Sequence, residues 1–357
     1  MENKDYLQPV TPDSLASMIE EATISVSNTY TQSPEVLKIG DSVIGTLGNF
    51  SASIGKAKSK KTFNVSAIVA SALSEGRVLH YSSEFPSDKR CILYIDTEQG
   101  RHHCQKVLNR ILRLANLPTD IDPENLKLLA LRKYSPEERL AIVEYALDTI
   151  PNIGLVIIDG IRDFVYDINS PSEATRIISK LMQWTDDKQI HIHTILHQNK
   201  NDEHARGHIG TELNNKAEAI MQIEVDKDDK SISIVEAVHI RDKEFEPFAF
   251  RINEQALPEL VESFSPKEKK VGRPKKDPFD PYRDIPESVH RKALELTFAN
   301  GDISGYDQVR GALQAGYANA GYKLSYNKSV DVLKFLTNKR MVVKEKNSYH
   351  FMPDYHY

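Results

Sequence analysis

The sequence of 357 residues contains only two cysteines, Cys91 and Cys104. Two thiols cannot build a disulfide framework or complete a zinc site made of cysteines, and such sparse usage is typical of a reducing compartment. No apolar run approaches the roughly 18 residues that a membrane helix needs. The polar first residues, MENKDYLQPVTPDS, also lack the layout of a secretory signal. We therefore expect a cytoplasmic protein that does not interact with membranes.

The chain also lacks a large positive charge. Its formal net charge is -5 at pH 7, which argues against a protein that coats nucleic acid along its whole surface. One stretch is an exception, because six cations stand against the single anion Glu268 between residues 267 and 276: Lys267, Lys269, Lys270, Arg273, Lys275 and Lys276. Any contact with nucleic acid should concentrate in this stretch and downstream of it.

Residues 35–263 predict an α/β core. Apolar runs at 91–98, 126–132, 154–160 and 190–198 alternate with helical patterns at 61–75, 101–115, 135–148 and 172–186, which is the pattern of βαβ units with a mostly parallel central sheet. Within residues 43–55 we expect a short apolar strand followed by a Gly/Ser loop. Three further strands, at 221–226, 231–240 and 247–252, are expected to be antiparallel.

Three other segments surround this core. Residues 1–34 form an N-terminal extension with one helix-like stretch at 14–22, and residues 264–285 form a basic, proline-rich linker. Residues 286–357 contain helical patterns at 287–299, 305–319 and 326–338, followed by two short strand-like pieces. Three helices before a hairpin is the order of a winged helix, so we expect a small α+β winged-helix-like domain.

The turn after the first core strand resembles a phosphate-binding loop. Residues 55–62 fit G-x-x-x-x-G-K-[ST] with one mismatch, because Lys60 replaces the second glycine. The pattern predicts backbone amides around a nucleotide, a lysine that reaches its β- and γ-phosphates, and a hydroxyl for Mg²⁺. The alternative is a lysine-rich surface turn. The predicted nucleotide contacts are Gly55, Lys56, Ala57, Lys58, Ser59, Lys60, Lys61 and Thr62, with Lys61 on the phosphates and Thr62 on the metal.

Two carboxylates follow neighbouring strands. Asp159 ends an apolar strand, where it would hold Mg²⁺ together with Thr62. Glu98 follows another strand and is the candidate base that activates water, with Asp96 in a structural role. The alternatives are a strand-ending turn for Asp159 and a helix cap for the acids at 96–98.

The strand at 190–198 ends in His197 and Gln198. Both would contact the γ-phosphate of the nucleotide and would transmit the loss of this phosphate to other parts of the chain. Histidines 191, 193, 197, 204 and 208 also raise the weaker alternative of a metal site. The phosphate loop, the two acid-tipped strands and this polar-tipped strand occur at βα spacing. Together they predict a site that binds and hydrolyses a nucleotide.

Residues 36–252 resemble the RecA-like ATPases of the RepA type, the helicases that replicate plasmids and mobile elements, with DnaB and RadA as more distant relatives. The resemblance rests on the segments IGTLGNFSASIGKAKSKKT, YIDTEQGR, LVIIDGIRDF, ILHQNK, ARGHIGTELNNKA and IRDKEFEPFAFRI. It implies ATP and Mg²⁺ as ligands, a catalytic glutamate at Glu98, and a ring of identical subunits with nucleotide at the interfaces. Cations from a neighbouring subunit would complete each site, and Arg241 and Lys243 match their position, with Arg206 as a second candidate.

Three segments are candidates for DNA contacts. In the family arrangement the loop 199–216 faces the ring channel, where Lys200, Arg206, His208 and Lys216 would track single-stranded phosphates. The segment VGRPKK resembles an AT-hook, which would place Arg273 and Lys275 in a minor groove. In the last domain, Lys328 and Lys334 would contact duplex phosphates. The alternatives are a polar loop, a linker that contains GRP by chance, and a protein-binding module.

Two functions remain open from the sequence. One is an ATP-driven motor or loader on DNA, which would serve replication or mobilisation of a mobile element. The other is an ATP-switched DNA-binding regulator, in which the irregular phosphate loop gives little or no turnover. A nucleotide-dependent kinase is a weaker third possibility because no acceptor site is visible.

Overall fold

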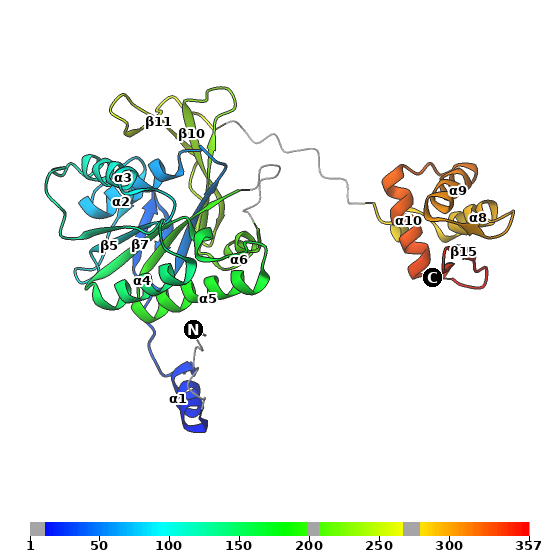
Figure 1. Cartoon of the computed structure of the whole chain (residues 1–357), viewed down its shortest axis with the longest axis horizontal. Helices are drawn as coiled ribbons and strands as arrows, with labels where there is room; N and C mark the ends of the chain where they lie inside the picture. Colours follow the sequence, from blue (N-terminus) through cyan, green and yellow to red (C-terminus); the bar gives the residue numbers. More distant parts are fainter. Residues whose placement is uncertain (1–10, 199–206, 267–278, 357) are drawn as a thin grey trace. The chain divides into compact units, whose positions relative to one another are not determined.

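The computed structural model describes residues 11–198, 207–266 and 279–356. Four of the predicted DNA contacts, Lys200, Arg206, Arg273 and Lys275, lie outside the described residues. The chain divides into two compact units, Met1–Lys267 and Glu268–Tyr357 (Figure 1). The boundary falls within the stretch predicted as a linker.

The core is built on a nine-stranded sheet with the order β12-β11-β10-β9-β3-β8-β7-β5-β6. The strands from β9 to β6 in this order run parallel, whereas β9–β10, β10–β11 and β11–β12 are antiparallel pairs. This confirms the predicted α/β fold with a mostly parallel sheet and antiparallel closing strands. The strands are β3 (Phe50–Gly55), β5 (Cys91–Asp96), β6 (Leu126–Ala130), β7 (Ile153–Asp159), β8 (His191–His197), β9 (Ala219–Val225), β10 (Ile232–Ile240), β11 (Phe248–Ile252) and β12 (Pro258–Leu260).

Helices cover both faces of this sheet (Figure 1). The first core cluster contains the buried side chains of α2 (Lys61–Ser74) and α3 (Arg101–Leu114). The second contains those of α4 (Pro136–Thr149), α5 (Pro171–Lys188) and α6 (Gly207–Lys216), together with the short 3-10 helix η1 (Ile161–Phe164). Every residue of β7 is buried, which explains why its sequence is an uninterrupted apolar run before Asp159.

The expectation for residues 43–55 was wrong in part, because the predicted Gly/Ser loop is a strand. Residues 42–46 form β2 (Ser42–Thr46), which pairs with β1 (Glu35–Ile39), and β1 also pairs with β4 (Tyr81–Ser83) in a separate three-stranded sheet. The chain then turns at Gly48, with φ of 82°, and continues as β3 in the centre of the main sheet.

Hydrogen bonds allow the serines of β3 to be buried. The Ser51 hydroxyl lies 2.7 Å from His191 Nε2 and 2.7 Å from His193 Nδ1. The Ser53 hydroxyl lies 2.8 Å from His193 Nε2. These pairs satisfy polar groups that would otherwise be costly to bury. The described residues contain no group of three or more His, Cys, Asp or Glu side chains that could hold a metal ion, and His204 of the alternative metal site lies outside them.

The second part of the segment 199–216, which the sequence predicted to be a loop, is a helix. Residues 207–216 form helix α6, whose Ile209 and Leu213 are fully buried in the core. His208 and Lys216 therefore belong to a packed helix.

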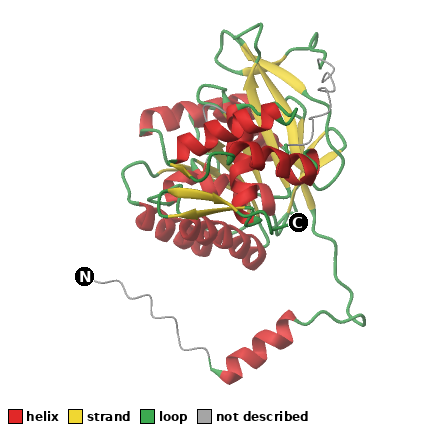
Figure 2. Ribbon diagram, turned by 90° about the vertical axis from the view of Figure 1, so that its right-hand side faces the viewer, coloured by secondary structure: helices red, strands yellow, loops and turns green. Residues whose placement is uncertain are grey.

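The N-terminal helix-like stretch is helix α1 (Pro12–Ala22), which has no buried residue and is followed by a segment without helix or strand at 23–34 (Figure 2). None of the helices in the described ranges is long and apolar enough to cross a bilayer.

The second unit contains the predicted three helices and hairpin. These elements are α8 (Glu287–Thr297), α9 (Tyr306–Asn319), α10 (Tyr326–Asn338), β14 (Val342–Glu345) and β15 (Ser348–Phe351). A two-residue strand that the sequence did not reveal, β13 (Ile303–Ser304), pairs with β15. The end of the stretch predicted as linker also belongs to this unit, because it contains helix α7 (Pro281–Asp284) and the fully buried Ile285.

Candidate active site

The phosphate-loop candidate joins the carboxyl end of β3 to the start of α2. Lys58 and Lys60 in this turn have φ of 68° and 65°, the left-handed region that glycine adopts most easily. Lys60 precedes the first residue of α2 and no side chain caps that helix end. The first amides of α2 are therefore available to an anion, as a phosphate loop requires.

The Lys60 side chain reaches the turn between β9 and β10. Its Nζ donates a hydrogen bond of 2.6 Å to the carbonyl of Ser231, in the turn between β9 and β10. A lysine thus takes the place of the second glycine without filling the loop.

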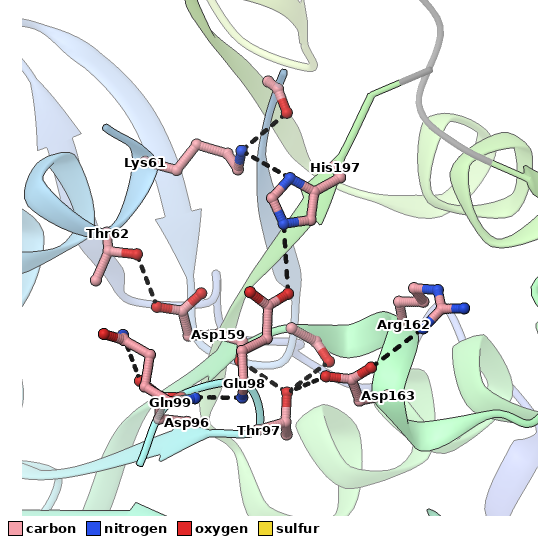
Figure 3. Close-up of polar contacts among 12 residues, drawn as sticks. Lys61, Thr62, Asp96, Thr97, Glu98, Gln99, Asp159, Arg162, Asp163 and His197 are labelled. Atoms are coloured by element: carbon pink, nitrogen blue, oxygen red, sulfur yellow. Dashed lines mark hydrogen bonds and ion pairs between the residues drawn. The ribbon is translucent and has the colours of Figure 1, made fainter. Parts of the chain in front are cut away.

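Lys61 is buried at the centre of the loop (Figure 3). Its Nζ donates to the carbonyls of Gly55 at 2.8 Å and Lys56 at 2.9 Å, and lies 3.1 Å from His197 Nδ1. Burial lowers the pKa of Lys61 to about 8, although the charges of Asp159 and Glu98 oppose this effect. A bound phosphate would place a negative charge next to the Lys61 ammonium. This charge would raise the pKa of Lys61 again.

Asp159 ends β7 next to the start of α2. One oxygen, Oδ2, accepts hydrogen bonds from Thr62 Oγ1 at 3.1 Å and from the Tyr94 hydroxyl at 3.0 Å. Burial raises the pKa of this carboxyl to about 7, with a further contribution from the charge of Asp96.

The surroundings of Asp159 fit a divalent cation. Carboxylate and hydroxyl oxygens are the ligand types that Mg²⁺ prefers, and Mg²⁺ is usually held by one or two protein oxygens plus phosphates and water. A cation would also compensate the cost of ionising a carboxyl this deeply buried. Thr62 and Asp159 are therefore the side chains that would hold Mg²⁺.

Glu98 lies at the tip of β5 and faces His197 (Figure 3). His197 Nε2 is 3.3 Å from Glu98 Oε1. The hydrogen bond from His197 lowers the pKa of Glu98, burial opposes this, and the charges of His197, Lys61 and Arg162 add to the lowering. Glu98 is thus an ionised carboxylate close to the loop, in the state that can accept a proton.

Asp96 shapes the turn that carries Glu98. Its Oδ1 accepts the backbone amides of Glu98 at 3.0 Å and Gln99 at 2.7 Å. The same residue pairs with Asp159 in the register between β5 and β7, so the two strand tips are held side by side.

Several residues that support this site were not found from the sequence. Tyr94 bonds Asp159, and the Thr97 hydroxyl lies 2.9 Å from Asp163 Oδ2 and 3.0 Å from the Asp159 carbonyl. A β-carbon at Gly160, whose φ is 104°, would come within 2.2 Å of that hydroxyl. The only sequence signal for Thr97 was its position between two candidate acids. No sequence pattern pointed to Tyr94.

The cleft beside the loop has a volume of about 350 Å³. It brings together the predicted Lys58, Ser59, Lys60, Lys61, Thr62, Glu98, Asp159 and His197. Gln198 lies beside them, because its amide donates to the Gly55 carbonyl at 3.1 Å. The cleft also contains residues that the sequence did not single out: Phe63, Gln99, His103, Lys106, Val107, Arg110 and Ile195.

The structure does not bring Arg241 and Lys243 to this cleft. The Arg241 amide bonds the Glu218 carbonyl, and the Glu218 amide bonds Phe50, at the opposite end of β3 from Gly55. Five residues of strand, about 16 Å, separate these two ends. Neither side chain lines the cleft of its own chain.

Two comparisons with known proteins found similarity to this chain. Residues 27–203, which include the loop, Glu98, Asp159 and His197, match the sequence profile of the family described as an AAA domain. No protein with a curated description matches the chain. Among solved structures, the crystal structure of the RadB recombinase is similar with a TM-score of 0.41 and 14% identity, over 59% of this chain and 90% of that one. The matched segment covers just under half of the chain, lies in the α/β core and includes the cleft described above.

Proposed function

We propose that the chain hydrolyses ATP with Mg²⁺ and acts on DNA as a ring-forming helicase or loader of the RepA type, used in replication or mobilisation of a mobile genetic element. The observation that carries the hydrolytic part is the convergence of Lys61, Thr62, Asp159 and Glu98 on one cleft. The motor, the ring and the mobile element rest on the resemblance of the sequence.

Each side chain has a defined task in this proposal. The amides at the start of α2 and the Lys61 ammonium bind the triphosphate. Mg²⁺ bound between Thr62, Asp159 and the phosphates would neutralise charge that develops on the transferred group. Glu98 orients a water in line with the γ-phosphorus and accepts its proton. His197 contacts both Lys61 and Glu98 and is therefore placed to respond when the γ-phosphate leaves.

We assign Arg241 and Lys243 to the nucleotide site of a neighbouring subunit, on the resemblance of the sequence. Their place at the opposite end of β3 from their own P-loop is compatible with this role. The role implies a homo-oligomer with nucleotide at its interfaces.

The second unit supports a DNA-binding role. Its order of helix, strand, two helices and hairpin suits a winged helix, with α10 as the recognition helix. Residues 279–356 contain 11 Lys and Arg against 9 Asp and Glu, whereas the whole chain is acidic. Lys334 is exposed on α10, and Lys328 Nζ lies 4.5 Å from the centre of the Phe279 ring. We assign Lys328 and Lys334 to duplex phosphates, Lys200 and Arg206 to single-stranded DNA, and Arg273 and Lys275 to a minor groove.

One observation favours the alternative of an ATP-switched regulator. Lys61 is held by two carbonyls of its own loop, and Lys60 occupies the position of a glycine. Both features would slow turnover if they persist when nucleotide binds.

Steady-state ATP hydrolysis, measured with and without single-stranded DNA, separates the two functions. For a motor, we expect turnover that DNA stimulates and that Lys61→Ala and Glu98→Gln reduce at least 100-fold, in line with the usual effect of removing one such group. Lys127→Ala, at an exposed position of β6, is the matched control and should retain activity. Binding of ATP without turnover would refute the motor and support the switch.

The oligomer is tested separately by mass measurement in solution. The ring predicts a larger species when Mg²⁺ and a non-hydrolysable ATP analogue are present. A monomer under all conditions would contradict the trans role of Arg241 and Lys243.

A further inference from the structure

One face of α3 contributes to the P-loop cleft at helical spacing. His103, Lys106, Val107 and Arg110 all line the cleft, and positions i, i+3, i+4 and i+7 share one side of a helix. Arg110 is the last of them, opposite Phe63 and Ser66 on α2. It has no role in the hydrolytic mechanism.

The positive charge of Arg110 has few compensating groups around it. Its guanidinium carbon lies 3.6 Å from the centre of the Phe63 ring, and one nitrogen lies 3.4 Å from the Ser66 hydroxyl. Its Nε is buried and has no hydrogen-bond partner in the described part of the chain. Burial lowers the pKa of Arg110, and the only opposing charge is that of Tyr94; no carboxylate of the described residues pairs with it.

Such an arrangement is costly unless a ligand completes it. A cation taken out of water needs acceptors, and a buried N–H without one costs about 1–3 kcal/mol. A methionine or leucine would fill the space between α2 and α3 without this cost. The placement of Arg110 at the cleft, with its guanidinium on the Phe63 ring and without a carboxylate partner, therefore points to a bound group that packs on this planar cation.

We propose that Arg110 is the nucleobase platform of this site, with the base stacked on the guanidinium plane that Phe63 supports from the other side. The inference rests on the proposed binding of ATP. The amides of α2 and Lys61 define where the phosphates lie, and Phe63 and Ser66 come later on α2, beyond those first amides. A nucleotide with its phosphates on the loop can therefore extend its base along the cleft toward α3. A planar cation on an aromatic ring suits a purine, because purines stack on arginine.

The test compares ATP with inorganic tripolyphosphate, which has the same phosphate chain and no base. Binding to the full-length protein with Mg²⁺ is measured by isothermal titration calorimetry for the unmodified chain, Arg110→Ala and Arg110→Lys. Loss of base stacking should weaken ATP binding about 5- to 150-fold in both variants, while tripolyphosphate binding stays within about 3-fold. Arg110→Lys keeps the charge and lacks the plane, so it should not rescue ATP binding. Arg113→Ala, at an exposed position one turn further along α3, is the matched control and should bind both ligands normally.

Each other outcome overturns the assignment. An equal loss for ATP and tripolyphosphate would make Arg110 a phosphate ligand, and rescue by lysine would show that charge alone matters. No change for either ligand would leave the Phe63–Arg110 pair as a clamp between α2 and α3. If the unmodified chain binds neither ligand, the proposed ATPase function itself fails, and the platform fails with it. Unchanged tripolyphosphate binding also shows that each variant has folded, so a loss for ATP alone cannot come from unfolding.

Discussion

Replacement of Asp159 by asparagine should stabilise the protein at neutral and alkaline pH when metal and nucleotide are removed. The carboxyl has a pKa of about 7 in the folded chain against an ordinary value of 3.8. Below pH 3.8 the group is protonated in both the folded and the unfolded chain and therefore does not change the free energy of unfolding. As the pH rises from 3.8 to about 7, the unfolded chain ionises first, so the carboxyl progressively lowers the free energy of unfolding.

The size of this effect follows from the two pKa values. At 1.36 kcal/mol for each pH unit, a gap of about three units gives a ceiling of ~4 kcal/mol above pH 7. The asparagine amide must still satisfy the Tyr94 and Thr62 hydroxyls, and a poorer fit there costs about 1 kcal/mol. We therefore expect Asp159→Asn to raise the free energy of unfolding by ~2–4 kcal/mol at pH 8, and by much less at pH 5.

Urea denaturation in EDTA at pH 5, 6, 7 and 8 measures this directly. The single tryptophan, Trp184, lies buried in the core unit and reports on its unfolding. Asp148→Asn is the control, because Asp148 pairs with Lys188 at the surface and such pairs contribute at most about 1 kcal/mol. A variant that is less stable than the unmodified chain at pH 8, or a difference that does not grow between pH 5 and pH 7, would refute the reasoning.

Three further predictions concern the loop, the metal and the second unit. Lys60→Gly should relieve about 1–2 kcal/mol of left-handed strain against a backbone entropy cost of about 0.5–1 kcal/mol. Thermal unfolding should therefore change little, and ATP affinity should stay within about 10-fold; a larger loss would make Lys60 itself a ligand. At pH 6, binding of Mg²⁺ with ATP should release up to about one more proton from the unmodified chain than from Asp159→Asn, since the metal displaces the proton of Asp159. Calorimetry in buffers of different ionisation enthalpy measures it, and at pH 8.5 the two proteins should release similar numbers of protons. Deletion of residues 266–357 should preserve basal ATP hydrolysis and weaken duplex binding together with its salt dependence; an unchanged salt slope would show that this unit does not bind DNA.

Much of the core was predictable because its periodicity is strong. The runs before Asp96 and Asp159 are continuous and apolar, and the helices between them repeat every three to four residues, so strand and helix type followed directly. Strand β3 was missed in part because SASIG has the composition of a loop. Its serines are buried only because His191 and His193, about 140 residues later, supply their hydrogen bonds.

The candidate site, like the core, could be predicted from the sequence only in part. The proximity of the loop, Glu98 and Asp159 could be predicted, because each lies at or just after the end of a strand in a recognisable pattern. The contacts of Tyr94 and Arg110 could not be found, because they cross between strands or between helices, and no spacing along one segment encodes them. Helix α6 was missed since its few apolar residues are interrupted by polar ones and the stretch begins with a glycine.

The far placement of Arg241 and Lys243 has a consequence for assembly. In the arrangement proposed above, these cations complete the site of a neighbouring copy, so each contact joins two different ends of the domain and all copies point in the same direction. Repetition of that contact gives either a closed circle or an open spiral. In a circle every copy has a completed site, whereas a spiral always leaves one terminal site incomplete. Turnover per subunit would then rise with chain concentration and level off only when the circle closes.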